Sequence, residues 1–217
     1  MATHSIELYR RELQGKLCRH VDHGEDFGPL IAAMTRVVHE TGTNGIAAPQ
    51  LGAYVQLAVV RKQVSGVRCQ MSGKTLSAAS ILEPETCNLV PAFEVLINPR
   101  VVNLAGKDLL DTECCLSLPP IEEATARIWR SEIAHVRAGT VENPNAEEVH
   151  IYRGTAARTV QHEIDHLQGI FFIDRCQPVA RGIVLRRFER YLREQEIERR
   201  EGTTCSVLRG ETAVCLQ

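Results

Sequence analysis

Residues 161–169 read QHEIDHLQG, and the pattern around them decides the fold. Four apolar side chains cluster on one side of a helical wheel, namely Ala157, Val160, Ile164 and Leu167. His162 and His166 point to the opposite side, where an ordinary surface helix would carry Lys and Glu. We therefore predict that 155–168 is an interior helix, with one side on the core and the other lining a site.

The same stretch holds the pattern H-E-x-x-H in His162, Glu163 and His166. Histidines four residues apart lie about one turn apart on one face of a helix, so both imidazoles can reach one metal ion. Glu163 can then act as general base on a water molecule at that ion. The motif predicts a metal centre for which it supplies two ligands.

The residues alone leave the third ligand open. The longer zinc-protease pattern would need a ligand at position 172, but that residue is Phe. Glu189 and Glu194 follow downstream, on the charged face of the last expected helix. A thiolate suits Zn or Fe(II) and would leave a coordination position for water. The candidate thiols are Cys87 and the two in ECCLSLPP at 113–120, Cys114 and Cys115.

The remaining pattern predicts an α+β domain. We expect antiparallel or mixed strands packed around the central metal-binding helix, with an N-terminal and a C-terminal helix. Thr155 is the expected N-cap of the central helix and Gly169 its stop. The expected helices are 27–41, ended by Thr43-Asn44-Gly45, and 180–200; the expected strands are 54–64, 93–104 with a break at Asn98-Pro99, 126–141 and 147–154.

Composition narrows the class of protein. The chain has 217 residues, 44% hydrophobic content and a formal net charge of −2, with no basic footprint for nucleic acid or membranes. No apolar run approaches the roughly 18 residues that span a bilayer. The start, MATHSIELYRREL, lacks the features of a secretory signal, so we expect a cytoplasmic protein. The sequence does not reveal the oligomeric state, and we favour a monomer. We expect one domain over 1–200 with an insertion at 65–90, and a flexible tail at 201–217.

Three segments, taken in order, resemble the peptide deformylase family. TNGIAAPQ at 43–50 is similar to the family motif G-x-G-[I/L]-A-A-P-Q, and ECCLS at 113–117 is similar to E-G-C-L-S. QHEIDH at 161–166 matches Q-H-E-x-D-H. The resemblance runs from about Asn44 to Arg175, including LINP at 96–99 and HLQGIFFIDR at 166–175.

This resemblance implies a metal-dependent hydrolase that removes the N-terminal formyl group from formyl-methionyl peptides of newly made proteins and releases formate. The implied ligands are Cys115, His162 and His166, and the implied metal is usually Fe²⁺, with Zn²⁺, Ni²⁺ or Co²⁺ as alternatives. Glu163 is then the general base. The implied partners are the N-formylated peptide or nascent chain, and the ribosome.

The resemblance also implies the residues around the substrate. The Gln50 side-chain amide and the Leu116 backbone N–H would stabilise the oxyanion of the tetrahedral intermediate. The implied substrate-binding residues are Asn44, Gly45, Cys114 and Arg127.

Two departures from the family motifs keep alternatives open. Thr43 and Cys114 replace glycines next to the substrate, which matters if either glycine needs a positive φ or a close approach. Arg158 and Thr159 also change the pocket wall, unless Arg158 points to solvent. The alternatives are an enzyme tuned to another N-formyl substrate, a weak relative that only binds, and a zinc endopeptidase with a downstream glutamate ligand.

Overall fold

The structure is a computed structural model that describes residues 5–62, 93–146 and 148–200. The expected insertion at 65–90 and the expected tail at 201–217 lie outside the described residues. Among the described residues, no helix is both long enough and apolar enough to cross a membrane.

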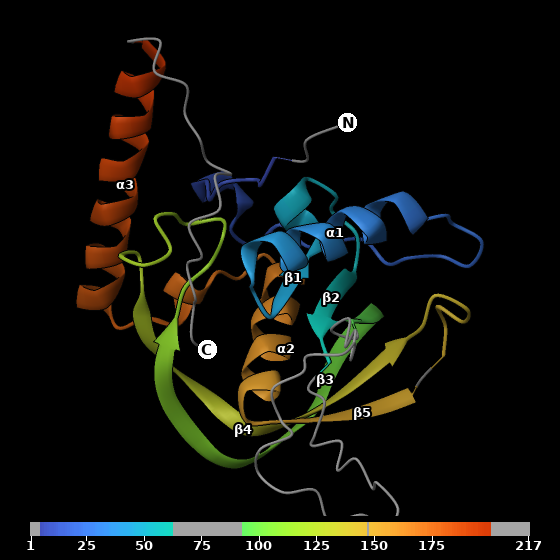
Figure 1. Cartoon of the computed structure of the whole chain (residues 1–217). Coiled ribbons are helices and arrows are strands. Elements are labelled where there is room, and N and C mark those ends of the chain that lie inside the picture. Colours follow the sequence, from blue (N-terminus) through green and yellow to red (C-terminus); the bar gives the residue numbers. More distant parts are fainter. Residues whose placement is uncertain (1–4, 63–92, 147, 201–217) are drawn as a thin grey trace, which may run out of the picture.

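One antiparallel sheet forms the framework, in the order β1-β2-β3-β4-β5. Together with its helices it confirms the expected α+β class, and its strands pair only in the antiparallel sense. The strands are β1 (Gly45–Ala47), β2 (Leu57–Arg61), β3 (Phe93–Glu113), β4 (Ala126–Gly139) and β5 (Glu148–Arg153). Figure 1 shows β3 and β4 as a long curved hairpin.

The helix α2 (Gly154–Leu167) packs on β4 and also contacts the other four strands (Figure 1). Every side chain from Ala157 to Leu167 is buried, so the prediction of an interior helix is confirmed. Its apolar side joins a core cluster with the inward side chains of β2, β3 and β4. The expected cap was wrong: Arg153 occupies the N-cap position, and Thr155 lies inside the first turn.

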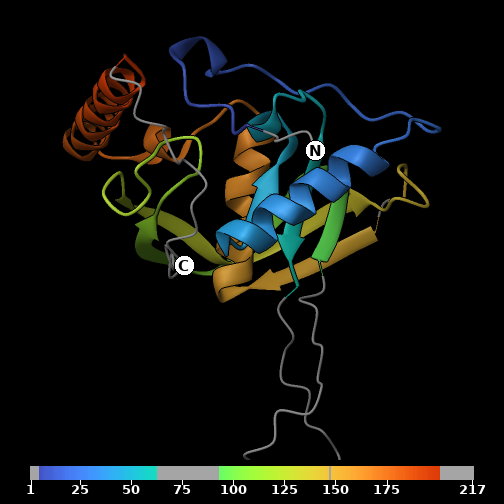
Figure 2. The ribbon, with the colours of Figure 1, turned by 45° about the horizontal axis from the view of Figure 1, so that its top comes forward.

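The helix α1 (Gly28–Thr41) forms where its apolar spacing predicts it, with Pro29 in the first turn. Its buried side chains pack on β1 and β2, and Figure 2 shows α1 crossing in front of these strands. The helix ends at Gly42, which adopts a φ of 70°. The predicted stop at Thr43-Asn44-Gly45 was therefore too late, and Gly45 instead begins β1.

The strand β3 does not break at Asn98-Pro99 as predicted. It passes through a register shift between Ile97 and Arg100 and continues to Glu113. Asn98 has a φ of 52°, a conformation that Asn tolerates better than most residues. Its side chain accepts a hydrogen bond from the Val21 N–H (2.8 Å) and donates one to the Val21 carbonyl (2.9 Å), which offsets the irregular backbone.

The helix α3 (Pro178–Arg200) confirms the expected C-terminal helix and stands at one side of the domain (Figure 2). Val184 and Phe188 attach it to a core cluster that contains Phe171 and Phe172. Three short 3-10 helices complete the described elements, at Arg11–Leu13, Ala48–Leu51 and Phe172–Arg175.

The N-terminal segment joins two loops that are distant in sequence. The Glu7 N–H donates to the Gln50 carbonyl (2.7 Å), and the Tyr9 N–H donates to the Ser117 carbonyl (2.7 Å). One short extended stretch thus holds the loop after β1 beside the loop after β3.

We expect Gly169→Ala to destabilise the fold strongly. Gly169 has a φ of 69°, and a Cβ there would lie 2.4 Å from the backbone nitrogen of Lys16. The left-handed conformation alone costs an L-residue about 1–2 kcal/mol, and the backbone contact adds to it. Gly24→Ala is the matched control, because Gly24 has a φ of 90° but open space around its Cβ position. Urea unfolding of both variants measures the difference, and equal losses would contradict the contact.

Candidate metal centre

The two histidines of H-E-x-x-H converge, as their spacing predicts. His162 and His166 are both buried, and their Nε2 atoms lie 3.2 Å apart. Burial holds the pKa of His166 well below its ordinary value, which keeps a lone pair on that ring. Two nitrogen donors therefore face one point on the buried side of α2.

Cys115 supplies the third donor of the group. Its Sγ lies 3.2 Å from His166 Nε2, and the donor atoms of the three residues all lie within 4.8 Å of one another. Cys114 is not part of this group, and Cys87 lies outside the described residues. In the described part of the chain, no other set of three or more His, Cys, Asp or Glu side chains converges in this way.

The downstream-glutamate alternative finds no support in the geometry. Glu189 and Glu194 lie on α3 with exposed side chains, and neither belongs to the converging group. Glu194 instead faces Arg190 one turn away.

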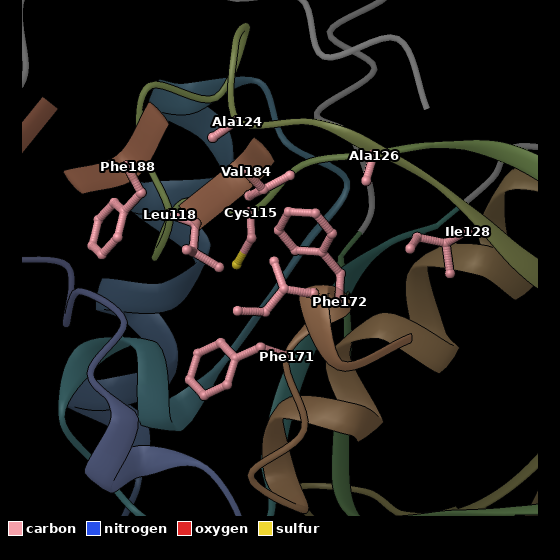
Figure 3. Packing of buried hydrophobic residues seen from close by; sticks show 10 residues of the cluster. Cys115, Leu118, Ala124, Ala126, Ile128, Phe171, Phe172, Val184 and Phe188 are labelled. Atoms are coloured by element: carbon pink, nitrogen blue, oxygen red, sulfur yellow. The ribbon is translucent and has the colours of Figure 1, made fainter. Parts of the chain in front are cut away.

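The surroundings of the three donors fit a divalent metal. Figure 3 shows the Cys115 side chain among Leu118, Phe171 and Phe172, which exclude bulk water from the sulfur. Imidazole and thiolate are the donors that Zn and Fe(II) prefer, and three protein ligands leave a position open for a reactant.

Glu113 orients the imidazole of His162 through the ring nitrogen that does not face the metal group. The His162 Nδ1–H donates to Glu113 Oε2 over 3.0 Å, which leaves Nε2 free to face the centre. Burial alone would raise the pKa of Glu113, but hydrogen bonds from Arg130 and His162 outweigh it and hold the pKa well below its usual range. The carboxylate is therefore charged and orients the imidazole.

A buried ionic network surrounds that carboxylate. Arg130 on β4 binds Glu113 through Nε (2.8 Å) and through its second terminal nitrogen (3.0 Å), and it reaches Asp165 over 2.5 Å. Arg175 also binds Asp165, with its Nε 2.5 Å from Oδ2. Asp165 thus braces α2 against β4 and the 3-10 helix after α2.

Sequence reasoning missed most of this network. In the sequence, Glu113 was recognised only as part of the ECCLS motif, and no role was predicted for Arg130. Arg158 is buried and binds Glu113 over 2.7 Å, so the suggestion that it points to solvent was wrong. A signal existed for Arg130, because Ile128 and Arg130 alternate with the exposed Trp129 and so face the core side of β4.

Glu163 lies beside the metal group with an incomplete set of partners. Burial raises its pKa to about 7, and its Oε2 is buried with no hydrogen-bond partner among the described residues. An orphaned buried oxygen is costly, so a water molecule or a substrate group is the expected partner. A Cβ on Gly45 would lie 2.8 Å from Glu163 Oε1 and 2.9 Å from Thr159, so Gly45 lets β1 approach α2 closely.

Gln50 and Leu116 line the same cavity as Glu163, His162 and Cys115. The Ala47 N–H donates to Gln50 Oε1 (2.9 Å), which turns the amide so that Nε2 lies 3.5 Å from Cys115 Sγ. The Gln50 side chain, in the loop after β1, therefore points its N–H donor toward the metal group.

Of the remaining predicted residues, Asn44, Gly45 and Cys114 line this cavity together with Thr43. Neither Thr43 nor Cys114 has a positive φ, so these substitutions impose no backbone strain. Arg127 does not line the cavity; it is exposed and faces the Leu110 carbonyl.

Comparison with known proteins agrees with this geometry. A family model described as polypeptide deformylase matches residues 5–182. A peptide deformylase of Thermodesulfovibrio yellowstonii is 31% identical over 191 residues, 87% of this chain and 98% of that relative. A crystal structure from Legionella pneumophila has a TM-score of 0.69 at 24% identity, covering 90% of this chain and 98% of that one. A class I type b peptide deformylase from Acinetobacter baumannii, solved with Met-Ala-Ser bound, has a TM-score of 0.60 at 23% identity and covers 81% of this chain and 99% of that one.

The depressed pKa of Glu113 predicts a dependence of stability on pH. Acid protonates this group in the unfolded chain, near its ordinary value of 4.5, before it protonates the folded protein. Its contribution is therefore fully present above that pH and falls by up to about 1.4 kcal/mol per pH unit below it. Urea unfolding of metal-free wild type and Glu113→Gln measures this as a gap in free energy that narrows below pH 4.5. A gap that stays constant down to pH 3 would contradict the shift.

Proposed function

Because the chain belongs to the polypeptide deformylase family, we propose that the centre formed by Cys115, His162 and His166 serves deformylation. The reaction is the hydrolysis of the N-terminal formyl group of a formyl-methionyl peptide, which gives formate and a free amino terminus. The observation that carries the proposal is the buried oxygen of Glu163, which has no hydrogen-bond partner within 5–62, 93–146 and 148–200 and lies beside three converging donors.

Glu163 moves the proton in this scheme. A divalent ion held by the three donors supplies Lewis acidity, which lowers the pKa of water and polarises the formyl carbonyl. Glu163 takes a proton from the attacking water and later gives it to the leaving amine, because a carboxyl with a pKa of about 7 can do both near neutral pH. The attack forms a C–O bond at the formyl carbon, and loss of the amine breaks the C–N bond.

Gln50 and Leu116 stabilise the charge that develops on the formyl oxygen. The amide of Gln50 is held by Ala47 before substrate arrives, so its Nε2 donor is preorganised toward the centre. The Leu116 backbone N–H is the second donor of this proposal, since Leu116 lines the same cavity.

The peptide chain binds along the open edge of β1. Among the described strands β1 pairs only with β2, so its other edge faces the cavity between Asn44-Gly45 and Cys114-Cys115. An extended peptide there can add as a further strand through backbone hydrogen bonds. Thr43 and Cys114 line this cavity and can tune which residues follow the formyl-methionine.

We assign Fe²⁺ to the centre, although Zn²⁺, Ni²⁺ and Co²⁺ suit the same donors. The formylated chain of a newly made protein is the proposed substrate, which places the enzyme at the ribosome in the cytoplasm. Arg127 is left out of the proposed peptide site because it lies away from the cavity. A monomer suffices, since one chain supplies every proposed group.

A tuned enzyme and a silent binding protein remain as competing functions, and they predict different activities. The tuned enzyme would release formate from other N-formyl amines faster than from formyl-Met peptides. The silent protein would hold metal without turnover. The placement of Glu163 and Gln50 favours turnover, because neither orientation is needed for metal binding alone.

The testing experiment is formate release from formyl-Met-Ala-Ser by anaerobically purified protein, with the metal content of each sample assayed. We expect about one metal ion per chain and turnover in the wild type. Glu163→Gln keeps the metal but loses turnover by at least about 10²-fold, the usual scale for general acid–base catalysis. Cys115→Ser lowers the metal content, and Cys114→Ser does not. Metal-loaded wild type without turnover on any N-formyl substrate would overturn the proposed function.

Gly45→Ala gives a second, more local prediction. The added Cβ crowds the Glu163 side chain and the Thr159 methyl group, so the base moves. A shift of about 1 Å costs on the order of 10²-fold in kcat. Metal content is expected to stay at the wild-type level. Gly182→Ala on α3 is the control, since its Cβ would meet nothing closer than 3.4 Å; equal kcat in both variants would refute the displacement.

A further inference from the structure

Arg158 lies on α2 one turn before His162 and is only 5% exposed. Arginine is almost never fully buried unless its charge is paired. No step of the proposed reaction uses Arg158. It is the second arginine, after Arg130, that binds the buried carboxylate of Glu113.

Its guanidinium makes three hydrogen bonds that converge from separate elements. One terminal nitrogen donates to Glu113 Oε1 (2.7 Å) and to the Ile128 carbonyl (3.1 Å). The other donates to the Leu109 carbonyl over 2.8 Å. Arg158 therefore links α2 to the end of β3 and to the facing part of β4.

The two carboxylate oxygens of Glu113 accept hydrogen bonds from different sets of residues, and only Oε2 contacts His162. Oε1 accepts from Arg158 and from Arg130 Nε, whereas Oε2 accepts from Arg130 and from His162 Nδ1. Arg130 binds both oxygens and reaches Asp165 on α2, and Arg158 adds a second link from Oε1 to this helix, one turn before His162. Arg158 and His162 sit four residues apart on the same helix and hold opposite oxygens of one carboxylate.

We propose that Arg158 is a positioning residue for the metal ligand His162, acting through Glu113. By holding Oε1, it keeps Oε2 on His162 Nδ1 and so keeps Nε2 aimed at the metal. This inference rests on the proposed function in one respect, namely that His162 binds metal. Partners behind a metal-binding His typically change metal affinity by 10–100-fold when they are removed.

A purely architectural role is the competing explanation. In that case Arg158 acts only through the carbonyls of Leu109 and Ile128, and anchors the β3–β4 hairpin to α2. Lysine separates the two roles: its ammonium can reach Glu113, but it cannot serve all three acceptors as the planar guanidinium does.

The experiment compares Arg158→Met and Arg158→Lys with wild type. Zn²⁺ affinity is measured by competition with a chromophoric chelator, the visible spectrum of the Co²⁺-loaded protein reports ligand geometry, and urea unfolding of metal-free protein reports stability. We expect Met to weaken Zn²⁺ binding 10–100-fold and to shift the Co²⁺ spectrum. Lys is expected to restore affinity to within about threefold while both variants lose stability. Arg153→Met is the control, because Arg153 is exposed and makes no capping hydrogen bond.

Two results would overturn the proposal. Wild-type affinity and an unchanged Co²⁺ spectrum in Arg158→Met would show that His162 does not depend on this residue. A loss in Arg158→Lys as large as in Arg158→Met would assign the effect to the hairpin carbonyls. If the Met variant does not fold, the Lys variant decides alone, since a tenfold loss there contradicts the proposal. Formate release by wild type is measured separately, so failure of the proposed function is recognised independently of metal affinity.

Discussion

The carboxylate of Glu113 is the point on which the rest of this structure depends. It ends β3, receives arginines from β4 and α2, and holds the imidazole of His162. Two residues later the same strand end delivers Cys115 to the centre. Glu113, which orients one ligand, therefore lies two residues from another, so this side chain links the sheet, the helix and the metal centre.

This arrangement explains how a helix with so many polar residues can lie in the interior. Buried charges are costly unless each is paired and hydrogen-bonded, and removing one partner typically costs about 3–5 kcal/mol. Here Glu113 and Asp165 are matched by Arg130, Arg158 and Arg175. The apolar side of α2 meanwhile packs on the sheet. Hydrophobic burial holds α2 against the sheet. The ionic network fixes the rotation of α2 about its own axis and its position along that axis.

Local patterns predicted the parts of the molecule that depend on neighbouring residues. The spacing of the apolar residues identified α1 and the interior position of α2, and the strands expected at 126–141 and 147–154 are found as the paired strands β4 and β5. The Cys115 ligand came from family resemblance, because spacing alone could not choose between adjacent cysteines. Glu113 with Arg158 could not be predicted, since 45 residues separate them and each looks like an ordinary charged residue until both are folded inward. The exact ends of helices also escaped prediction, as Gly42 and Arg153 show.

The N-terminal segment has a consequence for the order in which the molecule is completed during synthesis. Glu7 and Tyr9 leave the ribosome before their partners, the carbonyls of Gln50 and Ser117, which belong to loops made later. The ligands on α2 are made later still. The segment that holds Glu7 and Tyr9 therefore makes these two hydrogen bonds only after both loops have been synthesised.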